Sequence, residues 1–258
     1  MPEGDVVWYT AHRLGDALVS RTLTRTDFRV PRLATATLAG QVVTEVVPRG
    51  KHLLTRTSAG LTVHTHLRMD GSWRVTPAAE HVPDNYRIRL VLANADWQAT
   101  GYQLGAVELL RTNAEHLVTG HLGPDLLGPD WDTAEAVRRL TMDRARPVGE
   151  ALLDQRNLAG IGNVYKSEVL FLRGINPWTP VGDVVGMTAV TELARSLLDE
   201  NKDRIRRTTT GSSHPAEETW VYGRRGRPCR RCGTAIRSQG QQDRLTYWCP
   251  RCQERLSG

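Results

Sequence analysis

The chain has few cysteines, few lysines and no long hydrophobic run. Its 258 residues include four cysteines, all between residues 229 and 252. No run of about 18 apolar residues is present, so we expect no transmembrane helix and no membrane partner. The first residues, Met1-Pro2-Glu3-Gly4-Asp5, are acidic and lack the basic flank and apolar core of a secretory signal. The sequence therefore favours a cytoplasmic protein, in which thiols stay reduced.

Lysine is scarce although the chain is basic. Only three of the 34 basic residues are lysines, namely Lys51, Lys166 and Lys202, and the formal charge is +6 with a pI near 9.4. Such a balance favours a polyanionic partner. Lysine can lose its proton and act as a nucleophile or an acid/base, whereas arginine practically cannot. Lys51 is therefore a candidate for chemistry, and the alternative is a solvated loop charge.

The four cysteines form two Cys-x2-Cys pairs, Cys229/Cys232 and Cys249/Cys252, with sixteen residues between the pairs. This spacing predicts one Zn2+ bound by four thiolates, which leaves no open position and makes the metal structural. A pair of disulfides is the alternative, as is a zinc module that binds protein. Basic residues around the cysteines favour phosphate binding: Arg224, Arg225, Arg227, Arg230, Arg231, Arg237 and Arg244.

The first half of the chain has the pattern of a helix followed by strands. Residues 5–20 carry apolar side chains at helical spacing. From about residue 23 to 110, short runs alternate apolar and polar side chains, as in Leu61-Thr62-Val63-His64-Thr65-His66-Leu67, and are divided by Gly and Pro turns. This pattern is typical of an antiparallel sandwich or barrel.

The second half predicts a linker and helices. Gly123-Pro124-Asp125 and Gly128-Pro129-Asp130 mark the linker, and Asp132 with Glu135 can cap the helix that follows. Further helices are expected at about 150–156, 163–171 and 188–206. The polar segment 208–215 is expected to be a mobile loop. We find no internal repeat.

The turn Gly160-Ile161-Gly162-Asn163 lies between two expected helices. Its glycines allow a tight turn and a close approach of phosphate to backbone N–H groups, and the next helix would add its positive N-terminus. An ordinary helical hairpin turn is the alternative.

The N-terminus is a second candidate for chemistry. Removal of Met1 would leave the amine of Pro2 free, and an α-amine titrates near 8, so that more of it is neutral at pH 7 than of a lysine. Such an amine can attack an aldehydic or acetal carbon and form a Schiff base, with Glu3 supplying or taking a proton. The alternative is that this start has no function.

The order of five segments along the chain forms a further pattern. They are Pro2-Glu3-Gly4, Arg49-Gly50-Lys51-His52-Leu53-Leu54, His66-Leu67-Arg68-Met69-Asp70-Gly71-Ser72-Trp73, the stretch from Leu153 to Tyr165, and Val221 to Cys252. Together they resemble the formamidopyrimidine-DNA glycosylase / endonuclease VIII family, and most closely its endonuclease VIII branch. The resemblance covers nearly the whole chain.

The resemblance implies an α+β, multidomain protein. An N-terminal antiparallel β-sandwich with an N-terminal helix would span residues 1–118, and a linker would span 119–130. A helical helix–two-turn–helix domain would span 131–215, and a zinc-finger β-hairpin would span 219–253. The implied activity is that of a monomeric bacterial DNA repair enzyme, acting at the nucleoid, that flips a damaged base out of double-stranded DNA, removes it and cuts the strand.

The resemblance also implies roles for single residues. Pro2 attacks C1′ and forms the Schiff base, and Glu3 protonates the sugar. Lys51 neutralises phosphate and serves in β-elimination, and Arg244 grips phosphate and assists δ-elimination. The implied DNA contacts are Asn163 and His66 to phosphate, and Arg68 and Met69 near the everted base and the gap it leaves.

Two features depart from the formamidopyrimidine glycosylase pattern, and one residue departs from that of some endonuclease VIII members. Val6 replaces a second glutamate. Thr100-Gly101-Tyr102-Gln103-Leu104-Gly105 replaces the Asp-Pro-Arg-Arg-Phe-Gly loop, so that Tyr102 and Leu104 are the candidates to wedge into DNA. His121 stands where some endonuclease VIII members have arginine. These departures favour oxidised pyrimidines over 8-oxoguanine.

Two other functions compete with this one. A non-catalytic zinc-containing protein could use the same scaffold to recognise damaged or abasic DNA, and retention of Met1 would distinguish it by blocking the amine. A zinc-ribbon transcription or translation factor would explain the cysteines and the charge. It would leave the placement of Pro2, Glu3 and Lys51 without an explanation.

Overall fold

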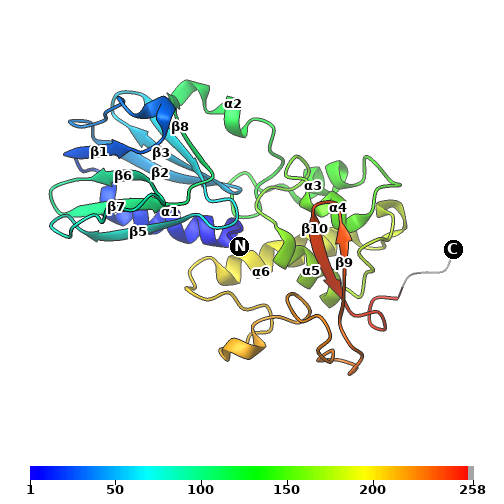
Figure 1. The fold of residues 1–258 in the computed structure, drawn as a ribbon. Helices are drawn as coiled ribbons and strands as arrows, with labels where there is room; N and C mark the ends of the chain where they lie inside the picture. Colours follow the sequence, from blue (N-terminus) through cyan, green and yellow to red (C-terminus); the bar gives the residue numbers. More distant parts are fainter. Residues whose placement is uncertain (255–258) are drawn as a thin grey trace. The chain divides into compact units, whose positions relative to one another are not determined.

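The structure, a computed structural model, describes residues 1–254. The chain divides into two compact units, of which the first spans Met1–His121 and the second begins at Leu122. The fold is α+β (Figure 1). Most strands belong to the first unit, and most helices belong to the second. Among the described residues, no helix is both long and apolar enough to cross a membrane.

The first unit is an antiparallel β-sandwich. One sheet has the order β1 (Arg25–Phe28), β6 (Ile88–Ala93), β7 (Trp97–Tyr102), β5 (Ser72–Pro77), and the other has the order β2 (Val43–Arg49), β3 (His52–Thr57), β4 (Leu61–His66), β8 (Ala106–Arg111). Helix α1 (Gly4–Leu18) precedes them. The short elements are η1 (Pro31–Leu33), η2 (Thr112–Ala114) and α2 (His116–Thr119).

Helix α1 supplies part of the core of the first unit. Val7, Ala11, Leu14 and Leu18 recur at helical spacing and are buried, as the periodicity predicts. The helix packs against β2 and β3 of one sheet and β5 and β7 of the other (Figure 1). This packing fixes the position of the residues just before α1, where the candidate nucleophile lies.

Strand β4 differs from the alternation of its sequence because both of its faces are buried. The polar side chains of Thr62, His64 and Thr65 are as inaccessible as Val63. On the face away from the apolar core, Thr62 donates a hydrogen bond to the carboxylate of Glu115, which also pairs with Arg56 at 2.7 Å. Hydrogen bonding therefore lets this strand carry Thr62 and His64 into a buried layer, whereas the Thr65 hydroxyl lies on the Val63 face without a hydrogen-bond partner among the described residues.

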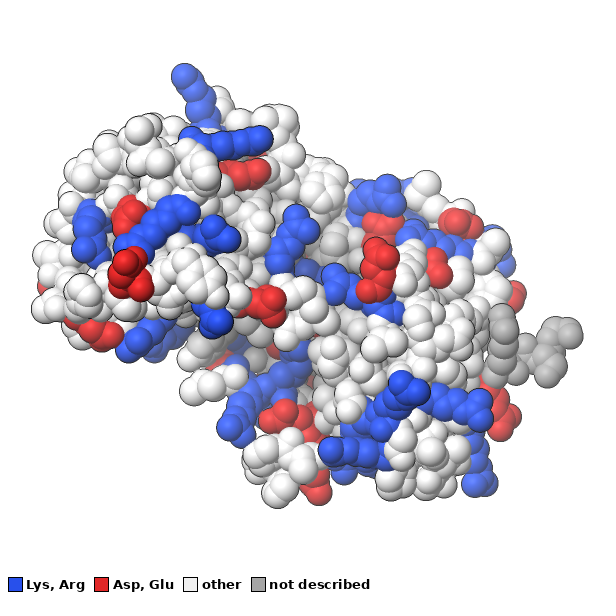
Figure 2. All heavy atoms as spheres, viewed as in Figure 1, with Lys and Arg blue, Asp and Glu red and all other residues white. Residues whose placement is uncertain are grey.

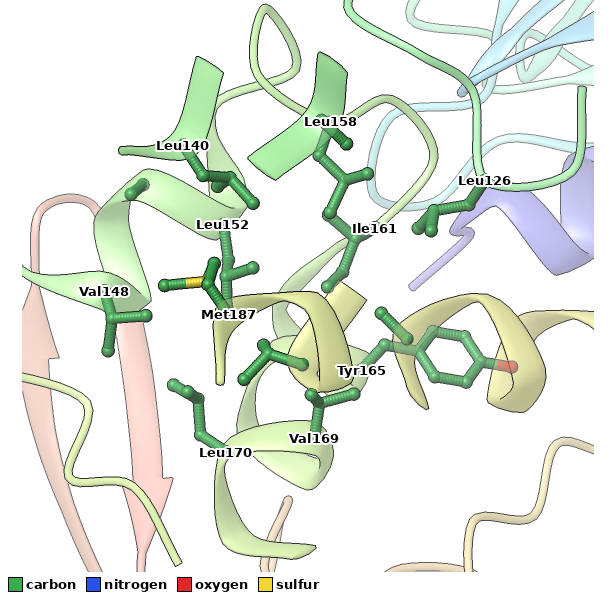
Figure 3. Packing of buried hydrophobic residues seen from close by; sticks show 14 of the residues in the cluster. Leu126, Leu140, Val148, Leu152, Leu158, Ile161, Tyr165, Val169, Leu170 and Met187 are labelled. Carbon is green, nitrogen blue, oxygen red and sulfur yellow. The ribbon is translucent and has the colours of Figure 1, made fainter. Parts of the chain in front are cut away.

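The second unit is helical with a β-hairpin. Its helices are α3 (Thr133–Leu140), α4 (Val148–Leu153), α5 (Asn163–Leu172) and α6 (Met187–Asn201), with short turns η3 (Val181–Asp183) and η4 (Pro215–Glu217), and the hairpin joins β9 (Arg237–Gln241) to β10 (Arg244–Trp248). Helix α5 is buried almost all round. Figure 3 shows Tyr165, Val169 and Leu170 of α5 within one apolar cluster together with Leu152 and Met187.

Three details of the second unit concern the expected boundaries. Asp132 caps α3 as predicted, because its carboxylate accepts the N–H of Glu135 at 3.0 Å. Helix α4 ends at Leu153 and not at residue 156, since Asp154 leaves the helix and binds Arg146 and Arg156. In the segment expected to be a linker, Leu122 and Leu126 are buried.

Helix α6 ends at Asn201, five residues before the expected end. The Asn201 amide donates to the carbonyl oxygens of Leu197 and Thr208, and its oxygen accepts the N–H of Thr208. Thr208 and Thr209 are buried. The expectation of a mobile loop is therefore wrong for the first residues of segment 208–215, because a side chain of the preceding helix holds them.

Candidate active site

The N-terminal residues lie at the start of α1. Glu3 is the N-cap residue and is fully buried, and its carbonyl oxygen accepts the N–H of Val7 at 3.1 Å. The helix N-terminus is positive, which favours a carboxylate there. Pro2 is half-buried, and its nitrogen belongs to the peptide bond with Met1. A buried acid thus lies next to a nitrogen that becomes an amine only when Met1 is removed.

Lys51 lies in a two-residue hairpin loop. Arg49 of β2 pairs with His52 of β3, so Gly50 and Lys51 form the loop between them. Gly50 has a φ of 55°, the left-handed conformation that a type II′ turn requires at its first central position. Glycine before Lys51 therefore sets the turn that presents the lysine, which lies in the same unit as Pro2 and Glu3.

Arg68 and Met69 follow β4 in a strained turn. Arg68 has a φ of 53°, unusual for a side chain of this size, and its N–H donates to Nδ1 of His66 at 2.9 Å. A Cβ on Gly105 would lie 1.9 Å from Cγ of Arg68, so glycine is needed where the arginine passes. Met69 is 45% exposed. The turn thus presents an apolar side chain beside a cation.

The structure corrects the expectation for Leu104. Its side chain is 6% exposed and belongs to the apolar core of the first unit, where it packs over Gly101. Inserting it into DNA would remove it from that core. The exposed residue of this loop is Gln103, whose φ is 47°. Gln103 and Met69 both border a cavity of about 510 Å³, with Arg87 and Arg89 on its wall.

Four of the eight histidines gather beside Lys51. Nδ1 of His52 lies 2.9 Å from Nε2 of His64, and Nδ1 of His64 lies 2.8 Å from the carboxylate of Glu108. The ring of His52 is 5.0 Å from that of His66 and 6.1 Å from that of His121. Of these residues, only His66 and His121 were expected from the sequence to contact DNA, and the alternation of His64 with His66 was the one local sign of this hydrogen-bonded chain.

Burial keeps two of these histidines neutral. It lowers the pKa of His52 to about 3, with smaller effects from the neighbouring imidazoles and from Arg68. Burial, followed by the charges of Arg68 and Lys51, lowers the pKa of His66 to about 4. Nδ1 of His66 accepts a backbone N–H, so the ring presents Nε2–H as its donor. A neutral donor next to cations suits phosphate.

In the second unit, Asn163 connects the glycine turn to the hairpin. Gly160 has a φ of 100°, and Gly162 is the N-cap of α5. The Asn163 amide donates to the carbonyl oxygen of Leu245 at 2.8 Å. Leu245 follows Arg244, which is exposed at the start of β10 next to the turn. The structure therefore brings together Asn163 and the segment that carries Arg244.

A buried polar network below this contact fixes the hairpin. Nζ of Lys166 donates to the hydroxyl of Thr246 at 2.5 Å, and that hydroxyl donates to Gln241. The Gln241 amide donates to the carbonyl oxygen of Pro177. Lys166 is fully buried. Its role is to hold β10 against α5. The scarcity of lysine in the sequence could not show whether Lys166 has such a structural role or a chemical one.

Glu168 binds the segment that leads into the zinc module. Its carboxylate accepts the N–H groups of Trp220, Val221 and Tyr222 at 2.7 to 2.9 Å and the hydroxyl of Thr209. The side chain is fully buried, and this burial raises its pKa. Four donors on one carboxylate satisfy a group that would otherwise be costly to bury. No sequence motif indicated this role.

The four cysteines meet at one point. Sγ of Cys229 lies 3.9 Å from that of Cys252, and Sγ of Cys232 lies 3.5 Å from that of Cys249. A tetrahedron with Zn–S bonds of about 2.3 Å has edges of ~3.8 Å. The N–H groups of Arg231 and Cys252 point at cysteine sulfurs. The cluster is thus suited to one structural zinc ion, with no bond between the cysteines.

Several arginines of the zinc module are structural. Arg224 is buried and donates to the carbonyl oxygens of Trp220 and Pro228. Arg231 donates to the last carbonyl oxygens of α5 and lies over the ring of Phe171. Figure 2 shows basic side chains close together over the segment before β9. Of the arginines that the sequence assigns to phosphate binding, Arg225, Arg227, Arg237 and Arg244 are exposed.

Family models match three stretches of the chain. The formamidopyrimidine-DNA glycosylase N-terminal domain matches residues 1–103, and the H2TH domain of the same glycosylase matches residues 122–213. The zinc finger found in FPG and IleRS matches residues 226–255. The matches follow the order of the sandwich, the helices and the cysteine cluster.

Curated relatives and solved structures agree with these matches. A probable endonuclease 8 2 of Streptomyces coelicolor is 55% identical over 98% of this chain and 94% of its own. The DNA-(apurinic or apyrimidinic site) lyase Nei2 of Mycolicibacterium smegmatis is 49% identical over 98% and 99%. Lactococcus lactis Fpg, solved with abasic DNA, is 24% identical and has the same fold, with a TM-score of 0.83 over 98% and 100% of the two chains. The chain therefore belongs to the formamidopyrimidine-DNA glycosylase / endonuclease VIII family.

Proposed function

We propose that the chain is a bifunctional DNA glycosylase and AP lyase of base excision repair. The observation that carries the proposal is the burial of Glu3, which follows Pro2 and is the N-cap residue of α1, in the same unit as the Lys51 turn. Relatives of similar length named endonuclease 8 and AP lyase support it. The partner is double-stranded DNA that carries a damaged base.

The proposed chemistry begins when Met1 is removed. The secondary amine of Pro2 attacks C1′, the glycosidic bond breaks, and the base leaves with a proton. Glu3 protonates the sugar ring oxygen, so the ring opens to an iminium, the Schiff base of a secondary amine. The iminium acidifies the C2′ hydrogen, and loss of that proton expels the 3′ phosphate. Lys51 assists this β-elimination, and no metal is needed at C1′.

The second unit is proposed to hold the strand. The second N–H of the Asn163 amide and the guanidinium of Arg244 would contact phosphate, and Arg244 would assist the δ-elimination that expels the 5′ phosphate. The contact between Asn163 and Leu245 supports a joint role. The boundaries proposed for the functional parts are 1–118, a linker 119–130, 131–215 and the zinc finger 219–253.

Oxidised pyrimidines are the proposed substrates. Val6 and the loop 100–105 depart from the pattern of the 8-oxoguanine enzymes, and the endonuclease 8 relatives support this reading. His66, Arg68, Met69 and His121 would line the DNA around the lesion. The exposed Gln103 replaces Leu104 as the candidate wedge. We further propose that the protein acts as a monomer on the bacterial nucleoid in the cytoplasm.

Borohydride trapping on a duplex with one abasic site tests the proposal. Protein of verified N-terminal mass, lacking Met1, is expected to form a covalent adduct that maps to Pro2. Glu3→Gln should bind the same duplex, and on a duplex that carries an oxidised pyrimidine it should release the base far more slowly than the parent. Asp16→Asn, an exposed carboxylate on the same helix, is the matched control.

Tight binding by Met1-free protein without any adduct would replace the lyase by damage recognition alone. That outcome is the non-catalytic alternative, which uses the same DNA contacts. Equal rates of cleavage by Met1-free protein and by protein that retains Met1 would exclude the Pro2 amine as the nucleophile.

A further inference from the structure

A hydrogen-bonded chain runs across the outer face of one sheet beside Lys51. His52 of β3 lies opposite His66 of β4, and His64 lies opposite Glu108 of β8, so all four side chains share one face. The contacts link Glu108 to His64 and His64 to His52, at 2.8 and 2.9 Å. The chain thus connects a half-exposed carboxylate to the residue that follows Lys51.

Hydrogen-bond rules fix the direction of this chain when it is neutral. Glu108 can only accept, so Nδ1 of His64 carries a proton and Nε2 of His64 accepts. Nδ1 of His52 must then donate to Nε2 of His64. Nε2 of His52 is left as an unprotonated nitrogen with a lone pair. A phosphate oxygen needs a donor, so the neutral chain is in the wrong state to bind one through His52.

One added proton reverses the polarity of the chain. A proton from solvent binds Nε2 of His52, the Nδ1 proton of His52 moves to Nε2 of His64, and His64 keeps its bond to Glu108. The positive charge then resides on His64 against the carboxylate, and His52 is neutral with Nε2–H as a donor. The carboxylate offsets the charge, which is the arrangement that makes a buried imidazolium tolerable.

We propose that Glu108, His64 and His52 form a proton-uptake chain that binds one proton when a DNA phosphate occupies the position beside Lys51 and His66. The inference rests on the proposed function, because it takes the DNA backbone as the ligand of this face. His52 and His64 are thereby positioning residues for the phosphate. Neither was assigned a role by sequence analysis.

The charges around the chain favour uptake only when phosphate is present. The groups that face it are Lys51 from the β2–β3 turn, His66 from β4, Arg68 after β4, Glu108 from β8 and His121. Lys51 and Arg68 oppose a further positive charge in the free protein. A bound phosphodiester adds a negative charge, and this favours the protonated chain. Binding and protonation are therefore linked in both directions.

The pH dependence of DNA affinity tests the chain. The probe is a duplex with one tetrahydrofuran abasic analogue, measured by fluorescence anisotropy at constant ionic strength between pH 5.5 and 8. Uptake of one proton lowers the logarithm of the association constant by up to about one per pH unit as pH rises. His64→Gln is expected to lose this slope and to bind like the parent at pH 8. His116→Gln, an exposed histidine of the same unit, should keep it.

Glu108→Gln removes the counterion but leaves both imidazoles. The slope should persist and move to lower pH, because the charged chain is no longer offset. Equal slopes for the parent and His64→Gln would overturn the proposal.

Ring-nitrogen NMR of the folded parent protein avoids dependence on variants. The His64 ring should gain a second ring proton when the DNA complex forms, and a ring whose signals are unchanged by DNA would overturn the chain. Abasic-site cleavage separates this failure from that of the proposed function. Normal cleavage with equal slopes removes only the proton chain, whereas no binding and no cleavage at any pH removes both.

Discussion

The two units position their candidate DNA contacts by different means. In the first unit, Lys51, Arg68 and Gln103 lie in tight turns next to strand ends, and the turns use left-handed backbone at Gly50, Arg68 and Gln103. In the second unit, the hairpin that carries Arg244 is held by buried side chains of α5. Left-handed backbone in tight turns thus positions one set, and buried polar contacts and the zinc site position the other.

Removal of zinc should break the second unit most severely. A structural zinc contributes about 10–16 kcal/mol of binding free energy, so chelation is expected to unfold the cysteine module and release the hairpin. Duplex affinity should fall by about 100-fold or more through loss of phosphate contacts. The first unit should keep its own thermal transition, which calorimetry with and without chelator would detect. Unchanged DNA binding by zinc-free protein would remove Arg244 from the contacts.

Substitution of Glu168 tests whether buried side chains contribute as much to the stability of the second unit as the metal does. Glu168→Ala leaves three backbone N–H groups without their acceptor, whereas the Thr209 hydroxyl keeps the carbonyl oxygen of Glu218. Buried donors without partners cost roughly 1–3 kcal/mol each, so the second unit should lose about 3 kcal/mol or more of stability to denaturant. Glu192→Ala, an exposed glutamate on α6, is the control. A loss no larger than that of the control would show that water replaces the carboxylate.

The same comparison explains which parts of the site were predictable. The cysteine pairs, the Asp132 cap and the periodicity of α1 are local patterns, and the structure contains all three. The contacts of Glu168 span 52 residues or more to the zinc module, and His64 is 44 residues from Glu108. Such partners depend on strand register and helix packing, so no local pattern specifies them.

Burial accounts for the corrections to single residues. Leu104 and Gln103 are adjacent in one loop, and only the packing over Gly101 decides that the leucine points into the core. Likewise Arg224 and Arg225 have the same charge, but only Arg225 is exposed. Composition predicted a phosphate-binding surface without indicating which arginines serve the fold.

Gly105→Ala should break the first unit locally. The new Cβ would overlap the Arg68 side chain, so the arginine must leave its place while the sandwich remains folded. We expect duplex affinity to fall by about tenfold, the effect of one lost DNA contact, with little change in melting temperature. Gly15→Ala on α1, where the nearest atom lies at 3.9 Å, is the matched control. A normal affinity would mean that Arg68 does not contact DNA from its present position.

Acid should cause a gradual loss of stability in the first unit, because two partly buried histidines there resist protonation. The folded pKa values of His52 and His66 are about 3 and about 4, below the ordinary value of 6.5. Between pH 6.5 and pH 4 the unfolded chain binds more protons than the folded one. The free energy of unfolding therefore falls as pH decreases from about 6.5 to 4. His52→Gln should make the free energy of unfolding less dependent on pH in this range, as thermal melts at a series of pH values would show. His12→Gln, a change at an exposed residue of α1, should leave this pH dependence unchanged. If the two variants lose stability equally with acid, the histidines beside Lys51 are protonated in the folded protein, and burial does not hold them neutral.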